Sequence, residues 1–180
     1  IAPEVTKSLP VFFSDAPRFP WRGLMIDSSR HFLSLSTIRT LIDASSFIKF
    51  NVLHWHLVDA IAFPLQLPSA PLLSDKGSFI LPNRSHLTYS LQDVADIVQY
   101  GFQRGVRIVP EIDVPGHSYS WGLGYPAITT KCPSLSSKNV NSVPLNPGVK
   151  QTYEIIEAIV KDVTRVVPDA YFHFGGDEVN

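Results

Sequence analysis

Two adjacent carboxylates, Asp177 and Glu178, follow a pair of glycines at the end of an apolar run. Neighbouring residues on a regular strand point to opposite faces, so both acids enter one pocket only where the pleat is broken. Gly175 and Gly176 allow such a break, because glycine adopts backbone angles that other residues avoid. Close carboxylates raise one another's proton affinity, which lets one of them act as a general acid. The alternative is a solvated acid pair at a strand end, without a catalytic role.

Histidines form a second group of candidate residues. His54 and His56 are separated by one residue, so on a strand both imidazoles lie on the same face. Together with His117 or His173 they would make a nitrogen-rich ligand set for Zn²⁺, and the chain would then be a metal-dependent hydrolase. The alternative, which we favour, is that they are core histidines bonded to neighbouring carbonyls. We therefore expect no metal and no other cofactor.

The composition excludes several classes of protein. With 180 residues, 44% of them hydrophobic and 17% charged, the chain is long enough for one domain with a substantial core. The net charge is −1 and there is no basic run, which argues against nucleic-acid binding. No apolar stretch is long enough to span a bilayer.

The sequon at Asn83 predicts a glycosylation site and favours a secretory route. The single cysteine, Cys132, is either a small buried side chain or half of a disulfide.

The elements that must position these residues alternate between strands and helices. Apolar runs predict strands at 23–27, 51–59, 106–113 and 170–175. Helical spacing of apolar residues predicts a first helix with Leu35, Ile38, Leu41, Ile42 and Phe47 on its buried face. Ser90 and Asp93 form a capping box for a second helix, which Gly105 ends.

The third predicted helix begins at Pro147, since proline fits the first helical position. Its buried stripe is expected to consist of Tyr153, Ile156, Val160 and Val163. The proline-rich stretches 60–88 and 114–146 are predicted to be long loops.

This order of elements predicts an α/β fold with a parallel sheet. Three strands end in an acid, Asp27, Asp59 or Asp113, and parallel sheets place their active sites at that edge. No glycine-rich phosphate loop follows the first strand, which disfavours an open nucleotide-binding sheet. We therefore predict a partial (β/α)8 TIM barrel, consisting of about the first four β/α units of the eight that a barrel requires.

Four segments taken together resemble the β-N-acetylhexosaminidases of glycoside hydrolase family 20, above all the lysosomal, vacuolar and secreted eukaryotic members. The segments are 22–31 (RGLMIDSSRH), 51–59 (NVLHWHLVD), 111–117 (EIDVPGH) and 173–179 (HFGGDEV). The resemblance implies a β/α barrel preceded by a smaller α/β domain. Residues 1–20 would then be a connector from a missing N-terminal domain, and residues 21–180 the N-terminal half of the barrel.

The resemblance also implies a reaction, the removal of terminal β-linked N-acetylglucosamine or N-acetylgalactosamine. The 2-acetamido oxygen of the substrate itself attacks the anomeric carbon, so family 20 is an exception to the two-carboxylate scheme. Glu178 would protonate the leaving oxygen and later activate water, and Asp177 would hold the acetamido N–H. Arg22 would bind sugar hydroxyls, although the strand prediction puts it at the start of the first strand. Asp59 and His117 would orient the two acids.

Some features depart from the family pattern. Family members often have a second polar residue after the position of Asp59, where this chain has Ala60. In many eukaryotic members a cysteine near the position of Cys132 pairs with one beyond the catalytic motif. The resemblance further implies a parent enzyme that is a homo- or heterodimer and is lysosomal, vacuolar or secreted. We expect the 180-residue chain alone to be inactive. The alternative is a non-catalytic half-barrel that acts by association through its open sheet edge.

Overall fold

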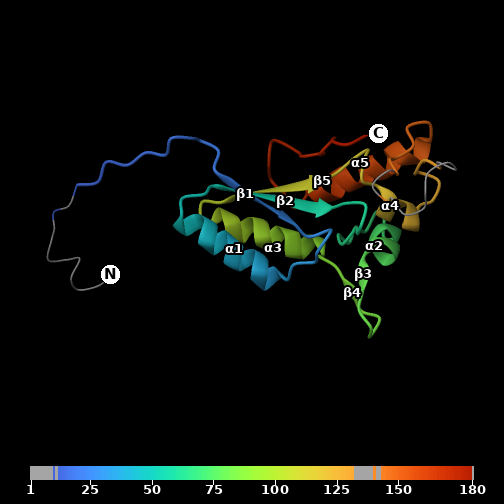
Figure 1. Ribbon diagram of the computed structural model, residues 1–180, viewed down its shortest axis with the longest axis horizontal. Coiled ribbons are helices and arrows are strands. Elements are labelled where there is room, and N and C mark those ends of the chain that lie inside the picture. The colour runs from blue at the N-terminus through green and yellow to red at the C-terminus, as the bar shows by residue number, and fades with distance from the viewer. Residues whose placement is uncertain (1–9, 11, 132–139, 141–142, 180) are drawn as a thin grey trace.

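A three-stranded parallel sheet forms the centre of the molecule (Figure 1). This computed structural model describes residues 10, 12–131, 140 and 143–179. Strand β1 spans Gly23–Asp27, β2 spans Val52–Val58 and β5 spans Arg107–Ile112, in the order β1-β2-β5. Gly23 pairs with Val52 and Val52 pairs with Arg107, so the strands begin level with one another. Their carboxyl ends therefore meet at one edge, and the first three predicted strands are confirmed.

Three long helices follow the strands along the chain. They are α1 (Leu35–Phe47), α3 (Leu91–Phe102) and α5 (Lys150–Thr164). The predicted capping box is present in α3, where the Ser90 hydroxyl accepts from the Asp93 N–H and the Asp93 carboxylate accepts from the Ser90 N–H. The start of α5 was predicted wrongly, because the helix begins three residues after Pro147.

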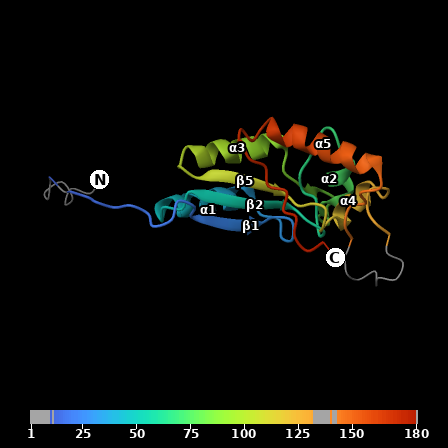
Figure 2. The same cartoon turned by 90° about the horizontal axis from the view of Figure 1, so that it is seen from above.

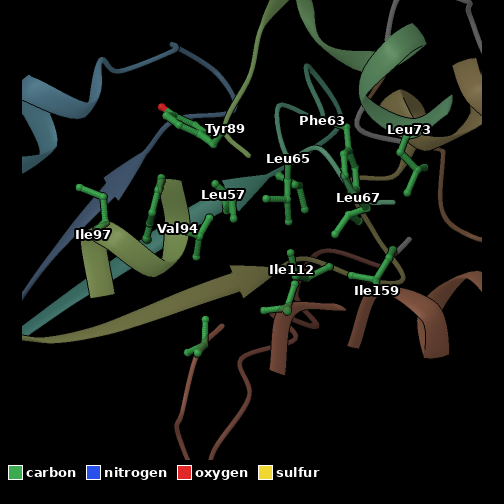
Figure 3. Close-up of a cluster of buried hydrophobic side chains, with 14 of the residues drawn as sticks. Leu57, Phe63, Leu65, Leu67, Leu73, Tyr89, Val94, Ile97, Ile112 and Ile159 are labelled. Carbon is green, nitrogen blue, oxygen red and sulfur yellow. The ribbon is translucent and has the colours of Figure 1, made fainter. Parts of the chain in front are cut away.

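The hydrophobic core lies between the helices and one face of the sheet (Figures 2 and 3). Its largest fully buried side chains include Trp55, Leu53, Ile38, Ile42 and Ile97. Two core predictions are wrong: Phe47 is 88% exposed and Tyr153 is 58% exposed. Both lie on the outer face of their helix. Val163 is buried as predicted, and Ile155 and Ile159 complete the buried stripe of α5.

The two stretches predicted as loops contain further elements. These are α2 (Leu72–Gly77), β3 (Phe79–Ile80), β4 (His86–Leu87) and α4 (Tyr119–Gly124). Helices α2 and α4 pack so closely that a Cβ on Gly77 would lie 2.8 Å from the Ser120 carbonyl oxygen, and one on Gly124 would overlap the Leu72 carbonyl oxygen. Tertiary packing of these two short helices overrides the proline-rich local signal.

The predicted fourth strand, 170–175, is reduced to a single bridge between Glu111 and His173. The N–H groups of Ile112 and Val114 donate to the carbonyl oxygens of His173 and Phe174, at 3.1 and 3.0 Å. Pairing stops there because Gly175 adopts a φ of +64°, which turns the chain away from the sheet. The segment nevertheless lies beside β5, in the position of the fourth strand of a barrel.

The described part of the proline-rich start, residues 10 and 12–20, contains no helix or strand and extends away from the sheet (Figure 1). Phe12 and Phe13 on this segment are 91% and 84% exposed. Among the described residues, no helix is both long and apolar enough to cross a membrane.

Candidate active site at the carboxyl ends of the strands

Acidic side chains gather where the three strands end. Asp27 is the last residue of β1, and Asp59 and Asp113 directly follow β2 and β5. Asp59 and Asp113 are fully buried. Burying a carboxylate costs several kcal/mol unless cations and hydrogen-bond donors surround it, so the partners of these acids define the site.

Arg30 supplies one of these cations. Its guanidinium lies 2.7 Å from the Asp27 carboxylate and 2.9 Å from the Asp59 carboxylate. The backbone N–H groups of Ser29 and Arg30 also donate to Asp27, and this turn holds the arginine over the strand ends. Burial alone would raise the pKa of Asp27, but the hydrogen bonds from Arg30 outweigh it and hold that pKa below its usual value.

His56 lies between two carboxylates. Its Nδ1 is 2.8 Å from Glu111 and its Nε2 is 2.8 Å from Asp59. Burial opposes a charged imidazole, but the hydrogen bonds to Asp59 and Glu111 outweigh this and raise the pKa of His56 to about 10. Burial likewise opposes the charge of Glu111, yet hydrogen bonds from His54 and His56 hold its pKa far below the usual range. His56 is therefore an imidazolium ion that donates from both nitrogens at neutral pH.

His117 connects the strand-end acids to the acid pair. Its Nδ1 donates to Asp113 at 2.6 Å and lies 3.7 Å from Asp59, while its Nε2 lies 3.1 Å from Glu178. Burial would lower the pKa of His117, but its hydrogen bond to Asp113 and the nearby charges raise it. Burial raises the pKa of Asp113 at the same time. A proton is therefore shared between His117 Nδ1 and Asp113, and the Nε2 of the same imidazole faces Glu178.

The glycine turn directs both acids toward His117. Gly175 and Gly176 have φ values of +64° and +97°, and Glu178 has a φ of +50°. The Gly176 N–H donates to Asp113 at 3.2 Å. The Asp177 carboxylate then lies 3.9 Å from His117 Nδ1, and Glu178 lies 3.1 Å from Nε2 of the same ring. The regular pleat is broken at the glycines, and the two adjacent carboxylates approach one imidazole from its two nitrogens.

Only glycine fits at position 175. A Cβ there would overlap a carboxylate oxygen of Asp113 and lie 2.7 Å from one of Glu111. The turn therefore rests directly on two buried carboxylates. In contrast, the side chains of Asp177 and Glu178 are 66% and 71% exposed, which leaves them accessible to a ligand.

The structure does not bring Arg22 to this site. Arg22 precedes β1, at the amino end of the sheet, and its guanidinium donates to the carbonyl oxygens of Phe19 and Lys49, each at 2.6 Å. The prediction that placed this residue at the start of the strand was correct. Binding of sugar hydroxyls by Arg22 has no support from this placement.

The two predicted metal histidines do share a face, as both contact Glu111. His54, Glu111 and His173 offer ligand atoms within 4.8 Å of one another, as do two other groups of histidine and acid in the site. However, the expected partners were carbonyls, whereas the observed partner of both histidines is a carboxylate.

Asn83 lies in an exposed turn, where its side chain accepts from Ser85. Cys132 lies outside the described residues.

Comparison with known proteins identifies the family. The model of the glycosyl hydrolase family 20 catalytic domain matches residues 19–180. The chain belongs to glycosyl hydrolase family 20. It is 46% identical over 166 residues to "Beta-hexosaminidase subunit beta" of Mus musculus, and 42% identical over 169 residues to "Beta-hexosaminidase subunit A1" of Dictyostelium discoideum. These alignments cover 92% and 94% of this chain but only 30% and 31% of the relatives, so the chain spans about a third of their length.

Solved family 20 structures have the same fold. The exo β-N-acetylglucosaminidase from Vibrio harveyi, in complex with N-acetylglucosamine, matches with a TM-score of 0.80 at 31% identity. The match covers 92% of this chain and 28% of that structure. It confirms that the chain folds as part of a (β/α)8 barrel.

Asp113 was placed at the active-site edge of the sheet from the sequence, together with Asp27 and Asp59, but it was given no role. Three residues of the cluster were not assigned to this site: Arg30, His56 and Glu111. The available signal was their position at or near the carboxyl end of a strand, the same criterion that identified Asp59 and Asp113. Arg30 lies three residues beyond Asp27, within one turn of the strand end.

Proposed function

We propose that this chain is part of a β-N-acetylhexosaminidase and supplies the two catalytic carboxylates of its active site, Asp177 and Glu178. The observation that carries the proposal is the convergence of two adjacent, exposed carboxylates on His117, above a buried charge network. Two carboxylates this close lie on the same side of a bound sugar, so neither of them can act as a nucleophile from the opposite face. The geometry instead suits a reaction in which the substrate's acetamido oxygen attacks the anomeric carbon.

In this mechanism Glu178 is the general acid, which protonates the glycosidic oxygen and then takes a proton from water. The Nε2 of His117 lies 3.1 Å from the Glu178 carboxylate, so the imidazolium form of His117 can return a proton to Glu178. Asp177 accepts the acetamido N–H and stabilises the positive charge of the oxazolinium intermediate. The site suits a cationic intermediate, because acids outnumber the cations around them (Asp27, Asp59, Glu111, Asp113, Asp177 and Glu178 against Arg30, His56 and His117).

We assign the sugar-binding arginine to Arg30 in place of Arg22. Arg30 is at the correct end of the sheet and bridges Asp27 and Asp59, yet 41% of its side chain is exposed. Its free N–H groups can therefore donate to sugar hydroxyls. Asp59 and His117 position the acid pair, as the sequence motifs imply.

The names of the relatives support a proposal for the substrate and assembly of the whole protein, and the family resemblance suggests its location. The relatives are named as β-hexosaminidase subunits, and one similar structure contains N-acetylglucosamine. We propose a terminal N-acetylhexosaminide of a glycan, glycolipid or chitin oligosaccharide as substrate, and a homo- or heterodimeric enzyme. A lysosomal, vacuolar or secreted location, N-glycosylation at Asn83 and a role of residues 1–20 as an interdomain connector belong to the same proposal.

The test is a chimera in which residues 19–180 replace the homologous segment of the mouse subunit beta. The chimera should release a chromogenic aglycone from an N-acetylglucosaminide, and Glu178→Gln should lower kcat about 10²- to 10⁴-fold. The matched control is Glu154→Gln, an exposed glutamate on α5 that pairs with Lys150. The 180-residue chain alone should show little or no turnover.

Two results would contradict the proposal. One is a folded chimera without activity, and the other is a Glu178→Gln chimera as active as its parent. Activity that is lost on treatment with a chelator and restored by Zn²⁺ would instead favour the metal-dependent hydrolase.

A further inference from the structure

Glu111 lies below the acid pair and touches neither acid, yet it is joined to β2 and lies against the segment that leads to the acids. It is 5% exposed, on the inner face of β5. One carboxylate oxygen accepts from His54 at 2.6 Å and from His56 at 2.8 Å, both on β2. The other oxygen is 3.4 Å from His173, on the segment that leads to Asp177.

We propose that Glu111 is a positioning residue for the acid pair, acting through His56 and through the glycine turn. The inference rests on the function proposed above, because it assigns Glu111 a part in the same reaction. Two separate sets of contacts carry it.

The first route runs through His56. Glu111 and Asp59 occupy the two ring nitrogens of His56, so both nitrogens must carry a proton. Removing the charge of Glu111 would leave His56 with one acidic partner and favour the neutral ring. Asp59 would then lose part of the positive charge beside it, 3.7 Å from the imidazole of His117, which contacts Glu178. Glu111 thus sets the electrostatics of the acid/base group without contacting it.

The second route runs through the backbone. The Cα of Gly175 rests against Glu111 and Asp113, so the carboxylate of Glu111 forms part of the floor of the turn. His173 stacks on His54 with ring centroids 4.6 Å apart, and its Nδ1 accepts from the Gly175 N–H at 3.0 Å. Glu111 accepts from His54, and the stack of His54 on His173 connects β2 to the segment that carries the acids. A small displacement of this floor would move both Asp177 and Glu178.

The first experiment measures the imidazole nitrogens of the 180-residue chain by ¹⁵N NMR, with no need for turnover. Both nitrogens of His56 should be protonated at pH 7.5. Glu111→Gln should make the ring neutral, whereas Glu111→Asp should keep at least part of the charge. His54→Gln is the matched control, since it removes the other partner of Glu111 and should leave His56 charged. A neutral His56 in the unsubstituted chain, or one unaffected by Glu111→Gln, would overturn the inference.

The second experiment uses the chimera. Glu111→Gln should lower kcat about 10- to 100-fold with little change in KM, since a shift of less than 1 Å in a reacting group has effects of that size. The alkaline limb of the kcat profile should move to lower pH, because His56 loses its proton earlier. Glu111→Asp should recover part of the rate. A Glu111→Gln chimera with unchanged kcat and pH profile refutes the inference and leaves the proposed function intact. An inactive parent chimera refutes the function, while the NMR result still decides the role of Glu111.

Discussion

The two ends of the sheet use similar residues in different ways. At the amino end, Arg22 donates to backbone carbonyl oxygens, and Arg107 forms a two-point ion pair with Asp169 at 2.6 Å. At the carboxyl end, Arg30 and His56 each bridge two carboxylates, and the histidine bridge is buried. At the amino end these arginines are satisfied by backbone carbonyl oxygens or by a single carboxylate, whereas acids are in excess at the carboxyl end.

This difference separates stability from function. A surface ion pair such as that of Arg107 and Asp169 contributes about 0 to 1 kcal/mol and needs no further explanation. A buried excess of acids destabilises the fold, and it persists where a site requires negative charge. Variants that affect only one end should therefore change either stability or activity, and the following predictions test this separation.

The largest expected effect compares two glycines with positive φ. Gly105 precedes β5 at the amino end and has a φ of +69°. A Cβ on Gly105 would meet no atom within 4 Å, whereas one on Gly175 would meet two carboxylates. Gly105→Ala should cost only the backbone strain, about 1–2 kcal/mol in urea unfolding. Gly175→Ala should lower kcat of the chimera about 100-fold or more.

The same glycine variants can be compared by hydrogen exchange in the 180-residue chain. Gly175→Ala should remove the protection of the Ile112 and Val114 amides, which donate to the fourth segment. Gly105→Ala should leave it unchanged. Full protection of both amides in Gly175→Ala would show that the turn tolerates a side chain.

A smaller effect is expected from the two arginines. Arg30→Ala should lower kcat/KM of the chimera about 10- to 100-fold, the equivalent of one or two charge-assisted hydrogen bonds. Arg22→Ala should lower the free energy of unfolding by about 1 kcal/mol, because its backbone partners lose a donor, and should leave kcat/KM unchanged. The reverse result would return the sugar-binding role to Arg22.

The pH dependence of stability should report on the carboxyl end. The folded-state pKa of His56 is about 10, above the usual 6.5, so its stabilisation is complete below pH 6.5 and is lost as the pH rises toward 10. The pKa values of Glu111 and Asp27 are lowered, so their contributions are lost as the pH falls below about 4. His56→Gln should remove an alkaline loss on the order of 2 kcal/mol, measured by urea unfolding at pH 6.5 and 9.5. His31→Gln, at an exposed histidine, serves as the control.

The smallest effect is expected at Asn83, which belongs to neither end. Expression in a secretory eukaryotic host should add a glycan, seen as a mass shift that Asn83→Gln removes. Activity and stability should not change measurably, because the turn is exposed. Absence of the mass shift would contradict the predicted modification.

The fold and the site were predictable from the sequence to different extents. The strands of the sheet follow from continuous apolar runs, and the capping box of α3 from two residues three apart. The fourth strand was predicted too long because Gly175 ends the pairing early, and α2 and α4 were missed because they depend on contact with one another. Asp177, Glu178 and His117 were found from local sequence. Arg30 and Glu111 were not assigned, because their roles arise from partners up to 57 residues away.

Among the residues that the structure describes, two backbone hydrogen bonds join the acid-bearing segment to β5, at Ile112 and Val114. We expect this segment to open locally at a lower free energy than global unfolding, because so few backbone hydrogen bonds hold it to the sheet. The apparent affinity for any ligand that needs both acids scales with the docked fraction. A ligand that bridges Glu178 and Arg30 would itself favour docking, so ligand binding and docking of the acid-bearing segment on β5 are thermodynamically linked.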